Sequence, residues 1–505
     1  MISPDGTKVA FRAAAQGGED LWVASANGSH VTRLTNGNQR PQQIQWSRFM
    51  PDLVYFRDGN GSLRTARASG GMPSDFFRMS FGASDSGRIP FSAKITIRRD
   101  EEFNEMFEQS WRALAEEFYD PLYHGINWVA MRAKYKPLVQ HVALKEDFYS
   151  LVSLMLGELN ASHLGIAGFT AVPEETTAEL GLLFDGSYRG LGLKVSEVIK
   201  RGPADKRGIT IKPGDVVLAI DSVGVGERTN ISQLLNAKVG ETVTLQVSAN
   251  PADPKARRRV DIQGASRESV RELMYERWVE HNARRVAELS HGRLGYIHIT
   301  SMDEAGLKRF LRGLYSDNFD KDAIVLDVRY NGGGFTHDQV LNYLGGRSHT
   351  SFRQRDGGQG TVMRSFDRKW GKPLVLLINN RTYSDAEIFP SAFRTLGLGR
   401  LVGQPTGAHV LGTYQVRLID GSHFRIPRVG VYTLAGASME KQGVVPDVLV
   451  EAQPDQLVRG IDPQLDVAVE VLQKDVLAWQ KAHPDMAQKP DAKAAAAVPV
   501  SKGKQ

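Results

Sequence analysis

The chain has 505 residues, more than one typical domain, and about three or four domains are expected. Its formal net charge of +6 is mild and no long basic run occurs, which argues against nucleic-acid binding. It contains no cysteine, which excludes disulfides and thiolate metal sites, and no apolar stretch approaches the roughly 18 residues of a membrane-spanning helix.

Residues 1–72 carry a repeat of short strands. A turn and an alternating strand from Ser3 to Phe11 are followed by a second strand at 20–24, and the unit restarts at Trp46. This pattern resembles the blades of TolB-like and tricorn-type β-propellers, so residues 1–72 are predicted to be a propeller fragment of about two blades. Two blades leave unpaired strand edges, and the chain is therefore expected to lack an N-terminal part.

Residues 98–172 are predicted to form a helical domain. Apolar residues recur at helical spacing from Phe103 to Phe118, and a second helix is predicted to begin at Lys145. A polar turn then carries Ser162 and His163. A histidine in such a turn is commonly an exposed residue without a special role, but His163 is the first candidate for a catalytic base.

Residues 178–252 are predicted to form a small β-rich domain. The stretch from Gly190 to Val195 alternates, a Gly-Asp turn at 214–215 precedes an apolar strand, and a short helix is predicted around Ile231–Leu235. This resembles a PDZ domain of the bacterial protease type, which adds an extended peptide to a sheet edge, although a purely structural role is equally open. The charge-rich residues 253–290 are predicted to be mostly helical, with the helix over Arg267–Glu288 and a solvated face that carries its arginines.

An α/β domain is predicted over residues 265–465. The apolar runs at 324–328 and 373–378 are typical of buried parallel strands. The first run leads into Gly332–Gly334, and the second leads into Ser384 at a strand-to-helix turn. Each piece alone is explained by a tight turn or a helix cap. Together they favour acyl-transfer chemistry, provided that a base is present. Residues 485–505 are expected to be a disordered tail.

Four motifs together resemble the tricorn protease family, within the peptidase class that includes the C-terminal processing peptidases. They are Gly157–His163, Arg329–Gly334, Ser384-Asp385 with Ile388-Phe389, and Glu440–Asp447. The resemblance covers nearly the whole chain. It implies a multidomain α+β and α/β protein with a β-propeller fragment, a helical tricorn-type C1 domain, a PDZ-like domain and a ClpP/crotonase-like α/β catalytic domain.

The same resemblance implies a serine-type peptidase that acts through an acyl-enzyme. It assigns roles to six residues: Ser384 as nucleophile, His163 as general base, Ser162 and Glu440 as the relay that orients the imidazole, and the backbone amides of Gly334 and Asp385 as the oxyanion hole. These roles agree with what the chemistry needs, because a serine hydroxyl requires a base within reach and the base requires an orienting partner.

Some features depart from related patterns. The processing peptidases use a Ser/Lys dyad, but no lysine lies between Ser384 and Glu440, which leaves His409 and His423 as rival bases. Pro390 falls inside the helix expected after Ser384 and is expected to remove one backbone hydrogen bond and kink the helix. The family's carboxylate for basic P1 residues has no clear match in residues 351–355, with only Asp356 nearby, so the P1 preference stays open.

The function predicted from the sequence is therefore hydrolysis of peptides or unfolded polypeptides, with no metal or organic cofactor implied. The resemblance also implies a homo-oligomer, with a hexamer as the specific expectation. A cytoplasmic location is expected, or a periplasmic one if a missing N-terminus carries a signal peptide. Two alternatives stay open: an inactive PDZ and propeller scaffold that binds peptides, and crotonase-like acyl-CoA chemistry.

Overall fold

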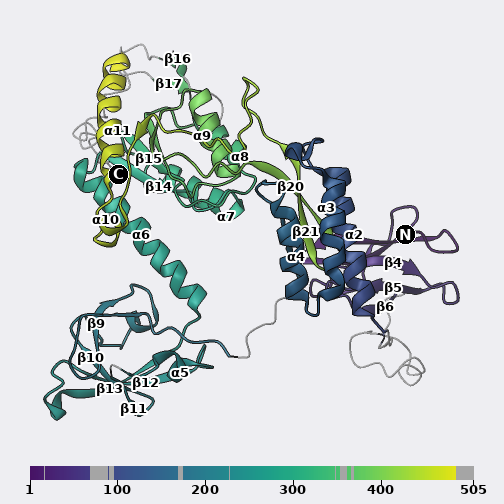
Figure 1. The fold of residues 1–505 in the computed structure, drawn as a ribbon, viewed down its shortest axis with the longest axis horizontal. Coiled ribbons are helices and arrows are strands. Elements are labelled where there is room, and N and C mark those ends of the chain that lie inside the picture. The colour runs from purple at the N-terminus through teal and green to yellow at the C-terminus, as the bar shows by residue number, and fades with distance from the viewer. Residues whose placement is uncertain are drawn as a thin grey trace, which may run out of the picture. The chain divides into compact units, whose positions relative to one another are not determined.

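A computed structural model describes residues 1–15, 18–68, 89, 96–168, 175–226, 228–346, 348–352, 361–364 and 369–484. It divides into two compact units, Met1–Arg98 and Arg99–Gln505 (Figure 1). The tail predicted to be disordered, 485–505, lies outside the described residues. The same is true of residues 353–356, where a P1-selecting carboxylate was sought.

The first unit contains two small antiparallel sheets. One consists of β1 (Lys8–Ala15), β2 (Gly18–Ser25) and β3 (Thr32–Arg33), and the other of β4 (Gln42–Trp46), β5 (Leu53–Arg57) and β6 (Leu63–Arg67). Alternate side chains from both sheets form one apolar core, which includes Leu21, Trp46 and Phe56. The repeat of antiparallel strands agrees with the strand pattern expected from the sequence, and the assignment of the two sheets to propeller blades stays a prediction.

The second unit begins with helices α2 (Arg99–Glu117), α3 (Trp128–Tyr135) and α4 (Lys145–Gly157), with short 3-10 turns at Tyr123–Gly125 and Lys136–His141. Their aromatic residues face inward as the helical spacing predicts, and Phe103 stacks on Phe148 with ring centroids 5.3 Å apart. A sheet of order β20 (Leu411–Arg417), β21 (His423–Gly430) and β7 (Gly165–Ala167) packs on the same core.

A second antiparallel sheet follows. Its order is β13 (Arg257–Gln263), β12 (Thr242–Ser248), β10 (Val216–Ile220), β9 (Leu193–Val198) and β8 (Leu182–Phe184), with β11 (Val223–Gly224) beside β10. Helix α5 (Ile231–Leu235) and 3-10 turns at Pro203–Asp205 and Pro254–Ala256 complete this part.

Strand β13 lies in the charge-rich segment ahead of the helix predicted over Arg267–Glu288, and the sequence analysis did not predict it. The strand pairs with β12 along its whole length. Arg257 and Arg259 are exposed, whereas Arg258 lies on the same face as the buried Val260 and Ile262 and pairs with the buried Asp215 at 2.6 Å. The high charge of the segment therefore hid a period of two.

The rest of the unit is a five-stranded parallel sheet of order β14 (Leu294–His298), β15 (Ala323–Asp327), β18 (Leu374–Ile378), β19 (Arg400–Gly403) and β22 (Val448–Leu449). The sheet has helices on both faces. One face is covered by α7 (Glu304–Arg312), α8 (His337–Asn342) and α9 (Asp385–Thr395), and a π-helical turn to Asp317 follows α7. The other face is covered by α6 (Arg267–Leu289) and α11 (Pro463–Ala482). Helix α10 (Pro454–Val458) precedes α11, and β16 (Ser348–Phe352) pairs with β17 (Thr361–Arg364).

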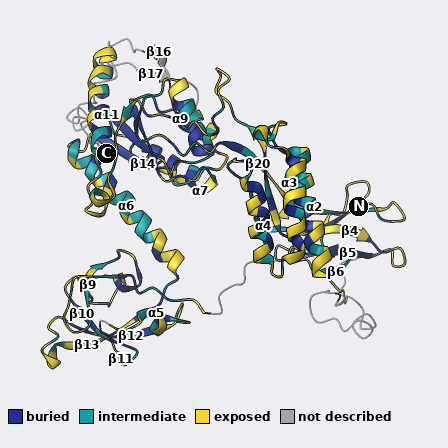
Figure 2. Ribbon diagram, in the orientation of Figure 1, coloured by how far each residue is buried: buried dark blue, intermediate teal, exposed yellow. Residues whose placement is uncertain are grey.

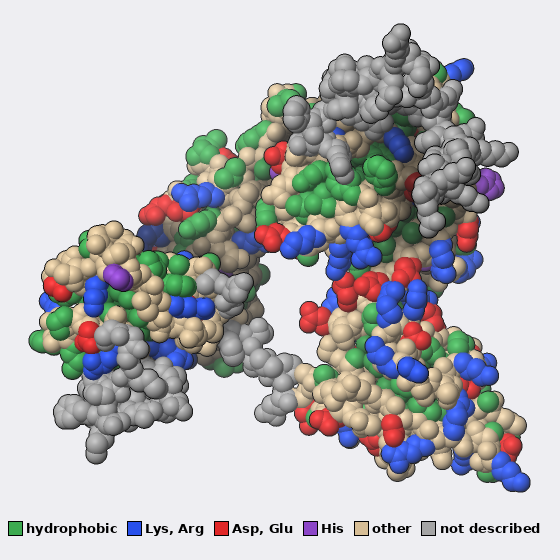
Figure 3. Space-filling view, turned by 180° about the vertical axis from the view of Figure 1, so that it is seen from behind, with side chains coloured by type: hydrophobic (Ala, Val, Ile, Leu, Met, Phe, Trp, Pro, Cys, Tyr) green, Lys and Arg blue, Asp and Glu red, His purple; other side chains and the backbone are tan. Residues whose placement is uncertain are grey.

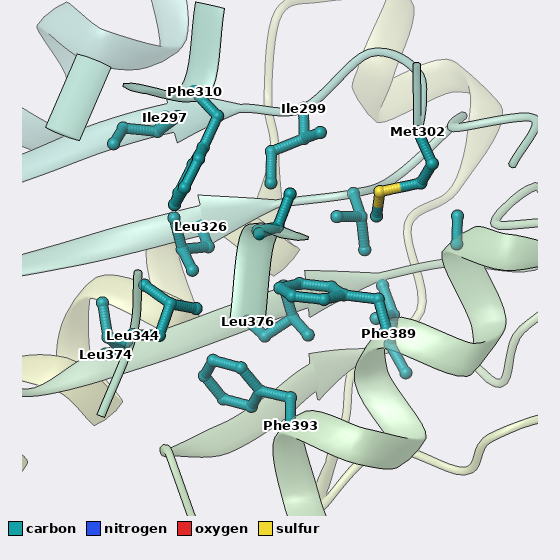
Figure 4. Packing of buried hydrophobic residues seen from close by; sticks show 14 of the residues in the cluster. Ile297, Ile299, Met302, Phe310, Leu326, Leu344, Leu374, Leu376, Phe389 and Phe393 are labelled. Atoms are coloured by element: carbon teal, nitrogen blue, oxygen red, sulfur yellow. The ribbon is translucent and has the colours of Figure 1, made fainter. Parts of the chain in front are cut away.

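The strands β14, β15 and β18 are buried along their whole length, as the unbroken apolar runs predict (Figure 2). On the face toward α9, Leu326 and Leu376 pack against Phe389 and Phe393 (Figure 4). This rigid layer holds the carboxyl ends of β15 and β18, from which the glycine cluster and Ser384 follow.

A buried ion cluster fixes the loop after β15. Arg329 is only 1% exposed. It contacts Asp327 at 2.7 Å and Asp462, the N-cap residue of α11, at 2.8 Å. Burial by itself would raise the pKa of Asp327, but the Arg329 guanidinium outweighs it and lowers that pKa. The start of the glycine loop is therefore tied to α11.

None of the helices in the described ranges is both long enough and apolar enough to cross a membrane.

Candidate active site

Ser384 occupies a sharp turn between β18 and α9. Its φ of 59° and ψ of −124° lie in a region that non-glycine residues rarely adopt, and α9 begins at the next residue. The N–H of Tyr383 donates to the Asn331 carbonyl at 2.9 Å, and the N–H of Ser384 donates to the His409 carbonyl at 3.1 Å. The strained turn thus projects the Ser384 hydroxyl away from the helix end, as in nucleophile turns of α/β hydrolases.

The hydroxyl of Ser384 meets the imidazole of His163, a residue 221 positions earlier. The Oγ–Nε2 distance is 2.9 Å. On the other side of the ring, Nδ1 lies 2.7 Å from Ser162 Oγ, and that hydroxyl donates to Glu440 Oε2 at 2.9 Å. Because the Ser162 proton is committed to Glu440, Ser162 Oγ accepts from Nδ1–H, which leaves the Nε2 lone pair for the Ser384 hydroxyl.

Glu440 is itself held in place. It is buried, it accepts from the backbone N–H of Ser162 at 2.8 Å, and it accepts from the N–H of Val410 at 2.9 Å. The carboxylate therefore fixes both the hydroxyl and the backbone of the segment that carries His163.

The surroundings keep His163 neutral. Burial and then the nearby charge of Arg425 lower its pKa, Glu440 opposes them only in part, and the resulting pKa is about 4. A neutral imidazole at neutral pH is the form that accepts a proton.

The glycine cluster approaches the Ser384 turn closely. A Cβ on Gly333 would lie 2.7 Å from the Ser384 Cβ, and one on Gly334 would lie 1.9 Å from the Met302 carbonyl oxygen. Both glycines have positive φ, 91° and 150°. Only glycine fits at either position.

Two backbone amides beside Ser384 are free. The bridge between Met302 and Gly334 uses the carbonyl of Gly333 and the N–H of Phe335, so it leaves the N–H of Gly334 unused. Among the described residues, neither this N–H nor that of Asp385 donates to an acceptor. They are the two amides that the sequence singled out as an oxyanion hole.

The imidazoles of the two rival bases, His409 and His423, do not take the place of the His163 imidazole at Ser384. His409 meets Ser384 through its backbone carbonyl, and His423 is an exposed residue at the start of β21. In the described structure neither imidazole is hydrogen-bonded to Ser384 Oγ. Pro390 is buried within α9, and the helix continues through it to Thr395.

Sequence reasoning missed the role of Glu387. This fully buried carboxylate accepts from the N–H groups of Ser384, Ala408 and His409 at 3.2, 2.7 and 2.8 Å, and from Thr406 Oγ1 at 2.5 Å. The sequence showed it only as an acidic residue in the first helical turn. Three of its donors are about 20 residues away, and nothing in their residue types marks them as partners.

Asp385 also has a partner that the sequence did not reveal. Its carboxylate binds Nδ1 of His337 at 2.5 Å and the His337 N–H at 3.1 Å, and this hydrogen bond raises the pKa of His337. The contact joins the start of α8, which follows the glycine cluster, to the start of α9, which follows Ser384.

Three parts of the chain match known families. Residues 99–157 match the tricorn protease C1 domain, residues 168–257 match a PDZ domain, and residues 293–450 match peptidase family S41.

Curated relatives agree with these matches. The chain is 29% identical over 394 residues to the tricorn protease of Thermoplasma acidophilum, which covers 76% of this chain and 36% of that protein. It is 32% identical over 485 residues to the putative tricorn protease homolog 2 of Streptomyces coelicolor, covering 90% and 40%. The chain thus spans well under half the length of these relatives.

Among solved structures, the crystal structure of the tricorn protease matches with a TM-score of 0.77 at 24% identity, covering 93% of this chain and 46% of that one. This likeness supports the fold. Together, the family matches, the curated relatives and this structural likeness identify the chain as a relative of the tricorn proteases. It carries a tricorn C1 domain, a PDZ domain and a peptidase family S41 domain.

Proposed function

We propose that this chain is a serine peptidase that hydrolyses peptide bonds through an acyl-enzyme intermediate. The observation that carries the proposal is the continuous hydrogen-bonded chain Ser384–His163–Ser162–Glu440, assembled from three separate segments. In this order of contacts, Ser384 is the nucleophile, His163 is its general base, and Ser162 and Glu440 orient the imidazole. The match to peptidase family S41 over residues 293–450 adds support.

In the acylation step, Ser384 Oγ attacks the carbonyl carbon of the scissile bond while its proton moves to His163 Nε2. The carbonyl oxygen becomes an oxyanion that the N–H groups of Gly334 and Asp385 are placed to receive. Removal of one such donor costs about 3–4 kcal/mol in other enzymes. The intermediate then collapses, His163 protonates the leaving amine, and the acyl group stays on Ser384.

Deacylation repeats these steps with water. His163 takes a proton from water, the hydroxide attacks the acyl carbon, and the Ser384 oxygen leaves with the proton returned by Nε2. In both steps the imidazolium donates its Nδ1–H to Ser162, whose hydroxyl donates to Glu440. The carboxylate thus stabilises the positive charge through one intervening hydroxyl.

The substrates proposed are peptides or unfolded polypeptides, and the family resemblance is the basis for this proposal. The family resemblance remains the basis for proposing a homo-oligomer, with a hexamer as the specific expectation, and for a cytoplasmic location. The assembled relay favours hydrolysis over the inactive-scaffold alternative.

A fluorophosphonate probe tests the proposal. We expect stoichiometric labelling of the intact chain, none of Ser384→Ala, and labelling of His163→Ala slowed by roughly a thousandfold or more. Ser391→Ala is the matched control, because this serine lies on the same helix but has no part in the relay. Labelling that persists in Ser384→Ala, with folding verified by circular dichroism, overturns the assignment.

A further inference from the structure

Tyr383, the residue before the proposed nucleophile, lies against the ring of His163. The two ring centroids are 4.7 Å apart and the ring planes differ by 20°. The phenolic oxygen lies 3.1 Å from His163 Nδ1. No role for Tyr383 follows from the relay itself.

The contact is with the face of the imidazole. Two nearly parallel rings at this separation overlap face to face, so the phenolic oxygen approaches Nδ1 from above the ring plane. The in-plane N–H direction at Nδ1 is taken by Ser162 Oγ at the shorter distance of 2.7 Å. Tyr383 therefore adds to the relay and does not replace any part of it.

The same turn thus contacts His163 twice. Ser384 meets Nε2 through its hydroxyl, and Tyr383 covers the ring face. The Tyr383 backbone is fixed by its N–H bond to Asn331 O, in the loop that leads to the glycine cluster. Because His163 comes from a distant segment, this second contact sets the plane of its ring relative to the attacking oxygen.

The stacked ring also bears on charge. An aromatic face attracts a cation more strongly than a neutral ring, and the proposed reaction converts His163 to an imidazolium. The charged or titratable groups around His163 are Arg425, which disfavours that cation, Glu440, which favours it, and the more weakly acting His409. Burial raises the pKa of Tyr383, so the phenol stays neutral and its face stays available.

We infer that Tyr383 is a positioning residue for the proposed acyl transfer: its ring fixes the imidazole plane and stabilises the imidazolium that forms as Ser384 attacks. The inference rests on the proposed function, and it assigns the effect to the aromatic face and not to the hydroxyl.

Two variants of the intact chain separate the face from the hydroxyl. Tyr383→Phe keeps the ring and removes the oxygen, whereas Tyr383→Leu removes the aromatic face. Tyr414→Leu serves as the control, because Tyr414 is an exposed tyrosine on β20 that contacts neither His163 nor Ser384. Thermal unfolding of all variants checks that the fold is kept.

The first measurement is the NMR shift of the His163 ring protons, which does not depend on activity. Ring current from Tyr383 should move these protons upfield in the wild type and in Tyr383→Phe, and the shift should be lost in Tyr383→Leu. The second measurement is the rate constant for fluorophosphonate labelling as a function of pH. We expect Tyr383→Phe to stay within about twofold of wild type and Tyr383→Leu to be roughly three- to tenfold slower.

The acid limb of the labelling profile should also move to lower pH in Tyr383→Leu, because loss of the aromatic face destabilises the protonated imidazole. Simple loosening of the fold does not predict this shift. Three results overturn the inference: no upfield shift in the wild type, a Leu variant that labels at the wild-type rate, or a Phe variant as slow as Leu. If the wild type is folded but unlabelled, the proposed function fails first.

Discussion

The imidazole of His163 owes its neutral state at neutral pH to its surroundings. A histidine in water has a pKa near 6.5 and is partly protonated at neutral pH. Here burial and the positive charge of Arg425 lower the pKa to about 4. Glu440, which accepts from the Ser162 hydroxyl, partly offsets them because its negative charge stabilises the protonated imidazole. One residue thus combines a low resting affinity for protons with a partner that supports the charged state.

This environment predicts the acid limb of activity. Since the pKa of His163 in the folded chain lies below the ordinary value, the neutral form persists as pH falls from 7 and is lost only as pH passes through about 4. Labelling of Ser384 should therefore stay level to about pH 5 and be half-lost near pH 4. In Arg425→Gln the midpoint should rise, because a positive neighbour has been removed. A wild-type midpoint near 6.5 would contradict this account.

Glu387 offers a test of whether its hydrogen bonds hold the backbone of Ser384 in place. Glu387→Gln replaces one of the two acceptor oxygens by an NH2 group that cannot accept, so the two donors bound to that oxygen lose their acceptor and the negative charge is lost. We expect the free energy of unfolding to fall by about 2–3 kcal/mol, as for other hydrogen bonds to charged groups, and labelling of Ser384 to slow. Glu146→Gln, an exposed acidic residue in the first turn of α4, should change neither quantity in urea titration or labelling.

At the scale of elements, the site is the meeting of a glycine loop after β15 with a strained turn after β18. The parallel pairing of these strands brings their carboxyl ends to the same edge, and the loop then touches the turn through Gly333. The geometry of the free amides depends on this contact, because any side chain at Gly333 would push Ser384 and Asp385 away.

Three neighbouring glycines make a matched set for mutation. Gly333→Ala and Gly334→Ala each place a methyl group within 3 Å of fixed atoms and require positive φ, so both should abolish labelling and lower the melting temperature. Gly332→Ala should be tolerated, because a Cβ there meets no atom within 4 Å. Equal loss of labelling in all three variants would show that the close contact is not what matters.

Comparison of elements shows where sequence reasoning succeeds. Strands such as β15 and β18 were predicted because they are buried on both faces and form unbroken apolar runs in the sequence, and α6 was predicted from its charge-rich composition. The pairing of β7 with β21 was not predicted, since it joins segments about 260 residues apart and no local pattern specifies it.

The same limit applies to the site. Ser384, His163, Ser162 and Glu440 were identified from short motifs, and their contacts match the relay that the resemblance implies. Glu387, His337 and Tyr383 were passed over because each acts through partners that only the fold brings near.

At the scale of the whole molecule, the two units have separate apolar cores. Charges of both signs are mixed over the face seen in Figure 3, in keeping with the mild net charge. Each unit therefore carries its own source of stability.

Separate cores predict separate unfolding transitions. Phe56→Ala removes a buried ring from the first unit and should lower one calorimetric transition, at a cost of about 3–5 kcal/mol, while leaving the labelling of Ser384 unchanged at moderate temperature. Phe393→Ala, in the core behind α9, should lower a different transition and reduce labelling. A single transition that moves in both variants would mean that the units unfold together.

The order in which the relay residues occur along the chain has a consequence for biosynthesis. His163 leaves the ribosome first, Ser384 much later, and Glu440 last, and strand β21, which pairs with β7, lies between the latter two. In the proposed relay, a nascent polypeptide therefore has no oriented base until Glu440 has been made. The proposed hydrolytic activity would then arise only after the segments that carry His163 and Ser384 have already been synthesised.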